Sequence, residues 1–109
     1  MPTSILLTLC TLPDRQSALE LAGKLVEQGL AACVNLTAPV TSVYHWEGKL
    51  ESAEEVMLLI KTSRRRYPAL ESAIRTLHPY ELPEIIAVPV EQGLQAYLDW
   101  VEQCTTTNS

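Results

Sequence analysis

Hydrophobic and polar positions in the N-terminal part of the chain follow two different periods. Residues 4–11 are apolar at nearly every position, a pattern typical of an internal strand that is covered on both faces. Pro13 and Asp14 end this strand, and an acidic side chain here favours the first turn of a helix. Apolar side chains then recur at helical spacing up to about residue 28, where Gly29 is a suitable C-cap. The positions that define this helix are Ala18, Leu21, Ala22 and Leu25.

A long β-hairpin is predicted for the middle of the chain. Residues 30–46 are rich in Val, Thr, Ala and Tyr, so we expect one bent strand with a bulge or an edge at Pro39. Residues 49–62 form the second arm, and Glu47-Gly48 supplies the turn between the two. Both arms exceed the average strand of about 5 to 6 residues, so they project as a ribbon past the body of the domain. A lone ribbon is marginally stable in water, which predicts a partner surface for it.

The sequence after the hairpin predicts a helix, a stiff connection and a short strand. Ser63 is expected to cap the helix, with Pro68 in the first turn, where a missing N–H does no harm. Pro79 ends the helix, because the residue before a proline is pushed out of the helical region. Residues 78–84 then form a stiff connection into a strand over residues 85–90.

The remaining residues complete the expected fold. Residues 92–103 predict a last helix, and residues 105–109 predict a polar, frayed tail. The order of elements is βαββαβ with a terminal helix, in a single domain that covers residues 1–109. This is an α+β, ferredoxin-like arrangement, in which two helices cover one face of a four-stranded antiparallel sheet. We expect the Leu6 and Thr8 side to be the bare face, and an apolar face left open usually meets another chain.

Composition and charge exclude several classes of partner. Hydrophobic residues make up 47% of the chain and charged residues 19%, which is typical of a sequence that folds. The net charge of -5 repels phosphate backbones, so nucleic acid is not an expected partner. Three cysteines without a CxxC spacing argue against a disulfide scaffold or a zinc knuckle. The apolar start lacks the features of a signal peptide or membrane span, so we expect a cytoplasmic protein with no membrane partner.

The sequence lacks the motifs of common enzymes. Dinucleotide-binding, P-loop, nucleophile-elbow and zinc-protease patterns are all missing, and four glycines are too few for a phosphate cradle. Glu81 and Glu84 flank Pro83 as a formal acid–base pair, but a chain of this size offers little room for a substrate cleft. We therefore predict no enzyme. Lys61 is instead expected to pair with Glu81 or Glu84 near an interface.

Cys10 and His78 are the candidate metal ligands, because thiolate and imidazole are ligands that copper and zinc prefer. Two ligands alone make a weak site, and plainer interpretations stay open. Cys10 can be a small buried hydrophobe, and a protonated His78 can complement the dipole at the end of its helix. We expect His45 near the hairpin tip to be a surface residue and Cys33 to lie in the core.

Other charged and aromatic positions also have simple interpretations. The basic run over residues 64–66 lies at a helix start, where a solvated face is more common than an anion site. Tyr44 and Trp46 lie near the hairpin turn and are predicted to anchor a partner chain.

Four segments of the sequence match a known pattern. They are Ala31-Ala32-Cys33-Val34-Asn35, Ser42-x-Tyr44-x-Trp46-Glu47-Gly48-Lys49, Ile60-Lys61-Thr62 and His78-Pro79-Tyr80-Glu81-x-Pro83-Glu84-Ile85-Ile86. Their order and spacing resemble the CutA divalent-cation tolerance family from about Leu9 to Trp100. The resemblance implies a ferredoxin-like subunit in a tight homotrimer similar to PII signalling proteins, with sheets packed edge to edge and ribbons wrapped on neighbours.

The resemblance also implies a function in the response to divalent metal ions, with copper as the favoured ion. Some members of the family bind copper through a cysteine on the first strand and adjacent histidines before the Pro-Tyr motif. In this sequence these positions correspond to Cys10 and His78. Leu77 precedes His78, so a two-histidine site is not reproduced, which argues against a tight copper site.

Two further interpretations remain. The first is a PII-like sensor that binds a small anionic metabolite in the clefts between subunits. The residues expected to line such a pocket are Cys33, Trp46, Lys61, Tyr80 and Glu84. The second is a purely structural trimer whose exposed residues serve a partner protein.

Overall fold

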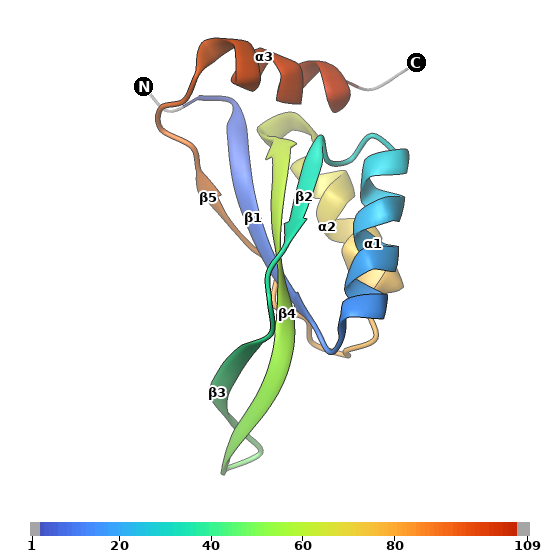
Figure 1. Cartoon of the computed structure of the whole chain (residues 1–109), viewed down its shortest axis with the longest axis vertical. Coiled ribbons are helices and arrows are strands. Elements are labelled where there is room, and N and C mark those ends of the chain that lie inside the picture. Colours follow the sequence, from blue (N-terminus) through green and yellow to red (C-terminus); the bar gives the residue numbers. More distant parts are fainter. Residues whose placement is uncertain (1–2, 107–109) are drawn as a thin grey trace.

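The computed structural model describes residues 3–106 and contains five strands and three α-helices. The strands are β1 (Ile5–Leu12), β2 (Cys33–Leu36), β3 (Val40–Trp46), β4 (Lys49–Ser63) and β5 (Ile86–Pro89). The helices are α1 (Arg15–Glu27), α2 (Tyr67–Leu77) and α3 (Gln95–Cys104), with a short 3-10 turn at Arg64–Arg66. Helices α1 and α2 cover one face of the sheet, and α3 lies across the end of the sheet opposite the hairpin (Figure 1).

All strand pairs are antiparallel, and the body of the sheet has the order β2-β4-β1-β5. Strand β3 pairs only with the first part of β4, from Val40 opposite Glu55 to Trp46 opposite Lys49. This part of β4 continues beyond the body, so that β3 and β4 form a projecting ribbon (Figure 1). The expected α+β, ferredoxin-like topology with a long hairpin is confirmed. The molecule is correspondingly elongated, with extents of 44 × 28 × 23 Å.

Glu47 and Gly48 form the turn of the hairpin, as predicted. Glu47 and Gly48 both have positive φ, of 52° and 79°, as a tight two-residue hairpin turn requires. The predicted single strand over residues 30–46 is two strands, because the ladder is interrupted between Leu36 and Val40. Pro39 lies in the interruption and has no N–H to donate, which is the physical reason for the break.

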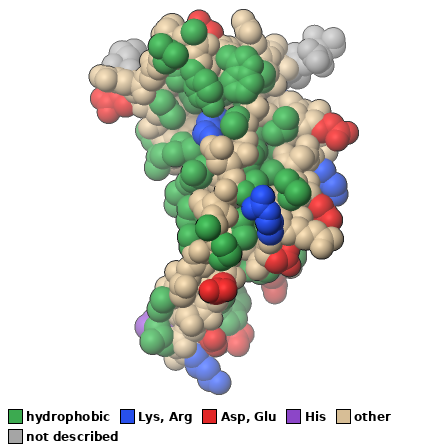
Figure 2. Space-filling view, viewed as in Figure 1, with side chains coloured by type: hydrophobic (Ala, Val, Ile, Leu, Met, Phe, Trp, Pro, Cys, Tyr) green, Lys and Arg blue, Asp and Glu red, His purple; other side chains and the backbone are tan. Residues whose placement is uncertain are grey.

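The prediction of which sheet face is bare was wrong. The side chains of Leu6, Thr8 and Cys10 are buried on the face that the helices cover. Leu7 and Leu9 point to the opposite face, which α1 and α2 leave open, and they pair there with Val88 and Ile86. Alternation defines two faces of a strand, but both faces of β1 are apolar, so the pattern alone does not assign the helices to one of them. Hydrophobic side chains gather along this open side of the body (Figure 2).

The main core lies between the sheet and helices α1 and α2. Its buried members include Cys10 and Leu12 of β1, Leu25 of α1, Leu58 of β4 and Ile74 of α2. A smaller cluster under α3 contains Ile5, Ala32, Leu98 and Val101. The Asp14 carboxylate caps α1 by accepting a hydrogen bond from the Ser17 N–H at 2.8 Å.

Two helix boundaries differ from the prediction. Ser63 is the last residue of β4 rather than the cap of α2, and the 3-10 turn Arg64–Arg66 separates the two elements. Helix α3 begins at Gln95 rather than at residue 92. Thr105 is fully buried, with its hydroxyl oxygen 3.0 Å from Ser63 Oγ and 2.8 Å from the Val101 carbonyl, so it does not belong to a frayed tail. Residues 107–109 of the predicted tail lie outside the described residues.

Two buried threonines on the same sheet face provide a matched test of the core. The Thr62 hydroxyl donates to the Leu30 carbonyl at 2.7 Å, whereas the equally buried Thr8 hydroxyl has no partner among residues 3–106. We expect Thr8→Val to raise the free energy of unfolding by about 1 kcal/mol, because a buried unpaired hydroxyl is unfavourable. Thr62→Val should lower it by about 1–3 kcal/mol, because it leaves a buried carbonyl unpaired. Urea denaturation of both variants checks the difference, and the opposite order would contradict this assignment.

Candidate functional site

The side chain of His78 lies at the outer edge of β1, beyond the point where β5 stops pairing with it. Strand β5 pairs with β1 only from Leu6 to Leu9, so residues 10–12 of β1 have no partner among the described strands on that side. His78 Nε2 lies 2.7 Å from the Thr11 carbonyl oxygen on this edge. The imidazole thus takes the place of a strand and supplies the short contact to this carbonyl, whose other partner is the Cys10 thiol at 4.0 Å.

The second ring nitrogen of His78 is also occupied. The Tyr80 backbone N–H donates a hydrogen bond to His78 Nδ1 at 3.0 Å. An acceptor at Nδ1 requires that the neutral ring carry its proton on Nε2, which then donates to the Thr11 carbonyl. The two aromatic rings of His78 and Tyr80 also lie against each other, with centroids 4.8 Å apart. Nε2 therefore holds the connection after α2 against the end of β1, while the Nδ1 hydrogen bond fixes the turn of that connection between His78 and Tyr80.

Tyr80 extends this arrangement to the root of the ribbon. Its hydroxyl donates to Glu55 Oε2 at 3.0 Å, and Glu55 is only 7% exposed although it is charged. Burial, followed by the hydrogen bond and charge of Glu55, raises the pKa of Tyr80 to about 12. The hydroxyl therefore keeps its proton and remains a donor at neutral pH. We call Thr11, His78, Tyr80 and Glu55 the edge network.

Cys10 precedes the edge network on β1 but points into the main core. Its side chain is fully buried, and burial raises the pKa of the thiol to about 12, with further contributions from the negative charges of Glu84 and Glu55. A thiol must lose its proton to bind a metal ion well. At neutral pH Cys10 is therefore a protonated, apolar core residue.

The arrangement around Cys10 and His78 does not fit a resident metal ion. Within residues 3–106, no group of three or more His, Cys, Asp or Glu side chains is placed to hold one. The lone pair of the His78 ring accepts a backbone hydrogen bond, and the Cys10 thiol is protonated. His45 is exposed on the ribbon, as predicted, and contributes nothing to this region.

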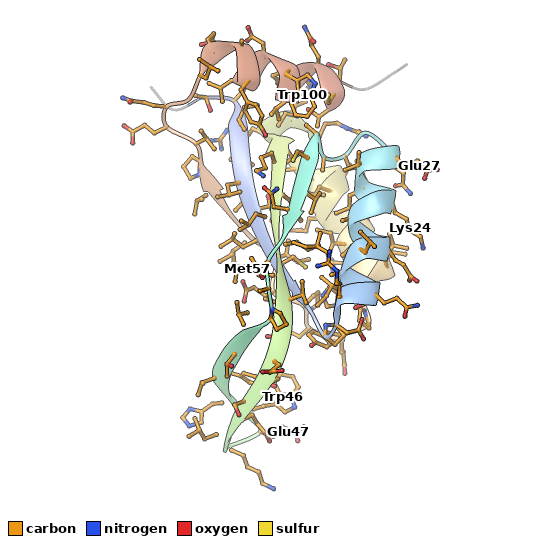
Figure 3. All side chains as sticks on the ribbon, in the orientation of Figure 1. Lys24, Glu27, Trp46, Glu47, Met57 and Trp100 are labelled. Atoms are coloured by element: carbon orange, nitrogen blue, oxygen red, sulfur yellow. The ribbon has the colours of Figure 1, made fainter. Side chains whose placement is uncertain are left out.

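The five residues predicted to line a ligand pocket do not come together within one chain. Lys61 Nζ lies 3.9 Å from Cys33 Sγ on the open sheet face, so these two are neighbours. Tyr80 belongs to the edge network, and Glu84 is exposed on the connection before β5. Trp46 is 49% exposed near the tip of the ribbon, at the opposite end of the molecule from Trp100 (Figure 3). Any pocket that uses all five requires more than one chain.

The sequence interpretation also missed partners that the structure supplies. Lys61 donates to Asn35 Oδ1 and forms no salt bridge with Glu81 or Glu84 within the described part of one chain, where Arg65 and Glu102 form the only salt bridge. The pairing near an interface stays a prediction. Cys33 is half-buried on the open face rather than in the core. No signal in the sequence separates Glu55 from the neighbouring glutamates of the ribbon. Its hydrogen-bond partner is Tyr80, which is distant in sequence.

None of the described helices is both long and apolar enough to cross a membrane.

Comparison with known proteins gives consistent matches along the chain. The family described as "CutA1 divalent ion tolerance protein" matches residues 6–104. The chain is 47% identical to mouse Protein CutA over 109 residues, which is all of this chain and 62% of the mouse protein. It therefore spans about three fifths of the length of that relative. A Divalent-cation tolerance protein CutA from Thermus thermophilus is 42% identical over 97 residues, covering 89% of this chain and 94% of that protein.

Solved structures match as well. CutA from Xylella fastidiosa superposes with a TM-score of 0.93 at 40% identity, covering 95% of this chain and all of that chain. The CutA protein from Archaeoglobus fulgidus, described as a periplasmic divalent cation tolerance protein, superposes with a TM-score of 0.91 at 34% identity, covering 94% and 99%. Because that relative is described as periplasmic, the cytoplasmic location expected for the present chain stays a prediction.

The edge network yields a matched test with two tyrosine–glutamate hydrogen bonds. Tyr80 donates to buried Glu55 at 3.0 Å, and Tyr67 donates to the more accessible Glu71 at 2.9 Å. We expect Tyr80→Phe to lower the free energy of unfolding by about 1–3 kcal/mol, because it leaves a buried carboxylate unpaired. Tyr67→Phe should cost well under about 1 kcal/mol, since water can replace the lost donor. Guanidinium denaturation compares them, and equal losses would show that the Glu55 contact has no special weight.

Proposed function

Since the chain belongs to the family of CutA1 divalent ion tolerance proteins, we propose that it works as a homotrimer in the response to divalent metal ions, with copper as the favoured ion. The family is defined by tolerance to ions rather than by an enzymatic activity, in agreement with the prediction that the chain is no enzyme. Three chains carry three times -5, or -15, which attracts cations without selecting one of them.

The main observation in support of a trimer is the open face of the sheet. Leu7, Leu9 and Leu59 are only half-buried there, and Ile86 and Val88 are 53% and 46% exposed. A continuous apolar surface of this kind is unfavourable in water unless another chain covers it. The ribbon adds exposed Val43, Tyr44, Trp46 and Leu50, and it has no core of its own. A second and third copy of this chain would cover both surfaces.

A charge placed on the open face tests the assembly. Val88→Glu should convert a particle of three times 12.1 kDa, about 36 kDa, into monomers, because carboxylates would have to be buried in the interface. Leu19→Glu is the matched control, since Leu19 is 58% exposed on α1, away from the open face. Sedimentation velocity distinguishes the two. A wild-type monomer, or a Val88→Glu variant that sediments like the control, would overturn the proposal.

The same pair of variants tests the metal response. In a host that lacks its own family member, we expect the wild-type chain and Leu19→Glu to support growth in graded copper chloride. Val88→Glu should support it poorly if the trimer is the working form. Equal growth of all three strains, with the assembly of each verified, would separate metal tolerance from oligomeric state.

A second candidate function is supported by Lys61. Its side chain is half-buried on the open face, and no carboxylate within residues 3–106 forms a salt bridge with its ammonium group. A partly buried cation without a counter-charge favours an anionic partner. This observation supports a PII-like sensor that takes a small anionic metabolite between subunits.

Thermal unfolding in succinate and in inorganic phosphate tests this candidate. Either probe at about 100 times its dissociation constant should stabilise the wild-type chain by about 2.7 kcal/mol. Lys61→Met should abolish the shift, whereas Lys49→Met at the exposed ribbon tip should keep it. Equal shifts in all three proteins would exclude Lys61 as the anion receptor.

A further inference from the structure

We infer that His78 is a structural clasp for the edge of β1 and that Cys10 is a core residue, so that neither holds the divalent ion. The clasp fastens the connection after α2 to β1 and, through Tyr80, to the root of the ribbon. This inference rests on the proposed metal response only for the choice of metal probes.

The hydrogen bonds of His78 leave no free ligand atom on the ring. A metal ion needs an unprotonated ring nitrogen directed at it. Nδ1 is the unprotonated nitrogen and accepts the Tyr80 N–H at 3.0 Å, while Nε2 lies 2.7 Å from the Thr11 carbonyl. Coordination at either nitrogen would break the hydrogen bond to the Tyr80 N–H or to the Thr11 carbonyl at a buried position, because His78 itself is only 8% exposed.

The surroundings of Cys10 oppose an ion for a separate reason. Its side chain is completely buried in the main core, together with Leu12 and Leu58. An ion bound there would have to leave water for an apolar interior with one sulfur ligand. The position before His78 supplies no further metal ligand, since Leu77 there has a partly exposed aliphatic side chain.

The clasp has a mechanical consequence for the ribbon. Glu55 lies on β4 at the border between the body and the ribbon, opposite Val40 of β3. The links from Thr11 to His78, from His78 to Tyr80 and from Tyr80 to Glu55 join β1 to this border through the connection after α2. His78, which corresponds to a copper ligand of some family members, therefore helps to position the arm that a neighbouring chain would meet.

Two substitutions of His78 separate a clasp from a ligand. In His78→Gln the amide N–H₂ can still donate to the Thr11 carbonyl, but an amide is a poor metal ligand. In His78→Ala both hydrogen bonds are lost. The clasp predicts an unfolding temperature that falls from wild type through His78→Gln to His78→Ala. A ligand role predicts that both variants lose metal binding equally, with no order between their unfolding temperatures.

Calorimetric titration of the full chain with copper chloride and with zinc chloride measures the dissociation constant of each ion. We expect His78→Gln, Cys10→Ala and the volume-filling Cys10→Val to keep the dissociation constants of the wild type. Loss of a true ligand would weaken binding by about 10- to 100-fold or more. Such a loss in folded His78→Gln or in either folded Cys10 variant would overturn the inference.

Thiol labelling gives an independent measurement on Cys10. With iodoacetamide at pH 8 and no metal, we expect Cys10 to stay unlabelled in the native chain and to react in denaturant, with half-buried Cys104 as the internal comparison. Native labelling of Cys10 at the rate of Cys104 would contradict its assignment to the core. If the wild type binds neither ion, the direct form of the proposed function fails, while the unfolding temperatures and the labelling still decide the inference.

Discussion

Strand β4 is the element on which the rest of the structure depends. Its 15 residues pair with β1 and β2 in the body and with β3 alone in the ribbon. Because one uninterrupted strand belongs to both parts, the direction of the ribbon follows from the twist of the sheet. The edge network meets β4 at Glu55, where its pairing passes from the body to the ribbon. The connection after α2 therefore helps to hold an arm that lies far from it in sequence.

Much of this architecture follows from local sequence signals. Periodicity predicted the order of the elements, and Glu47-Gly48 between two alternating arms predicted the hairpin turn, in which both residues adopt positive φ. The bare face was assigned wrongly because both faces of β1 are apolar, and only packing against α1 and α2 decides between them. Thr105 was placed in a tail because its polarity hides a buried hydroxyl that contacts Ser63. Such contacts depend on long-range packing, which no local pattern encodes.

The candidate site shows the same limit in a sharper form. Cys10 and His78 were selected because their side chains are common metal ligands, a property that belongs to the residue type. Whether they bind depends on what else they touch: a backbone carbonyl and a backbone N–H for His78, and an apolar core for Cys10. Cys33 and Lys61 lie side by side on the open face, but the pocket between subunits for which they were named stays a prediction, and the joining of Tyr80 to Glu55 could not be foreseen from their spacing. Members of one family can share a function without using the same residues as metal ligands.

The most direct measurement of this account is the nitrogen-15 NMR spectrum of the His78 ring at neutral pH, before and after saturation with zinc. The clasp predicts a neutral ring with its proton on Nε2 and an unprotonated Nδ1, and it predicts that zinc leaves both nitrogen signals unchanged. A ring that carries its proton on Nδ1, or a large shift of either His78 nitrogen on addition of zinc, would contradict it.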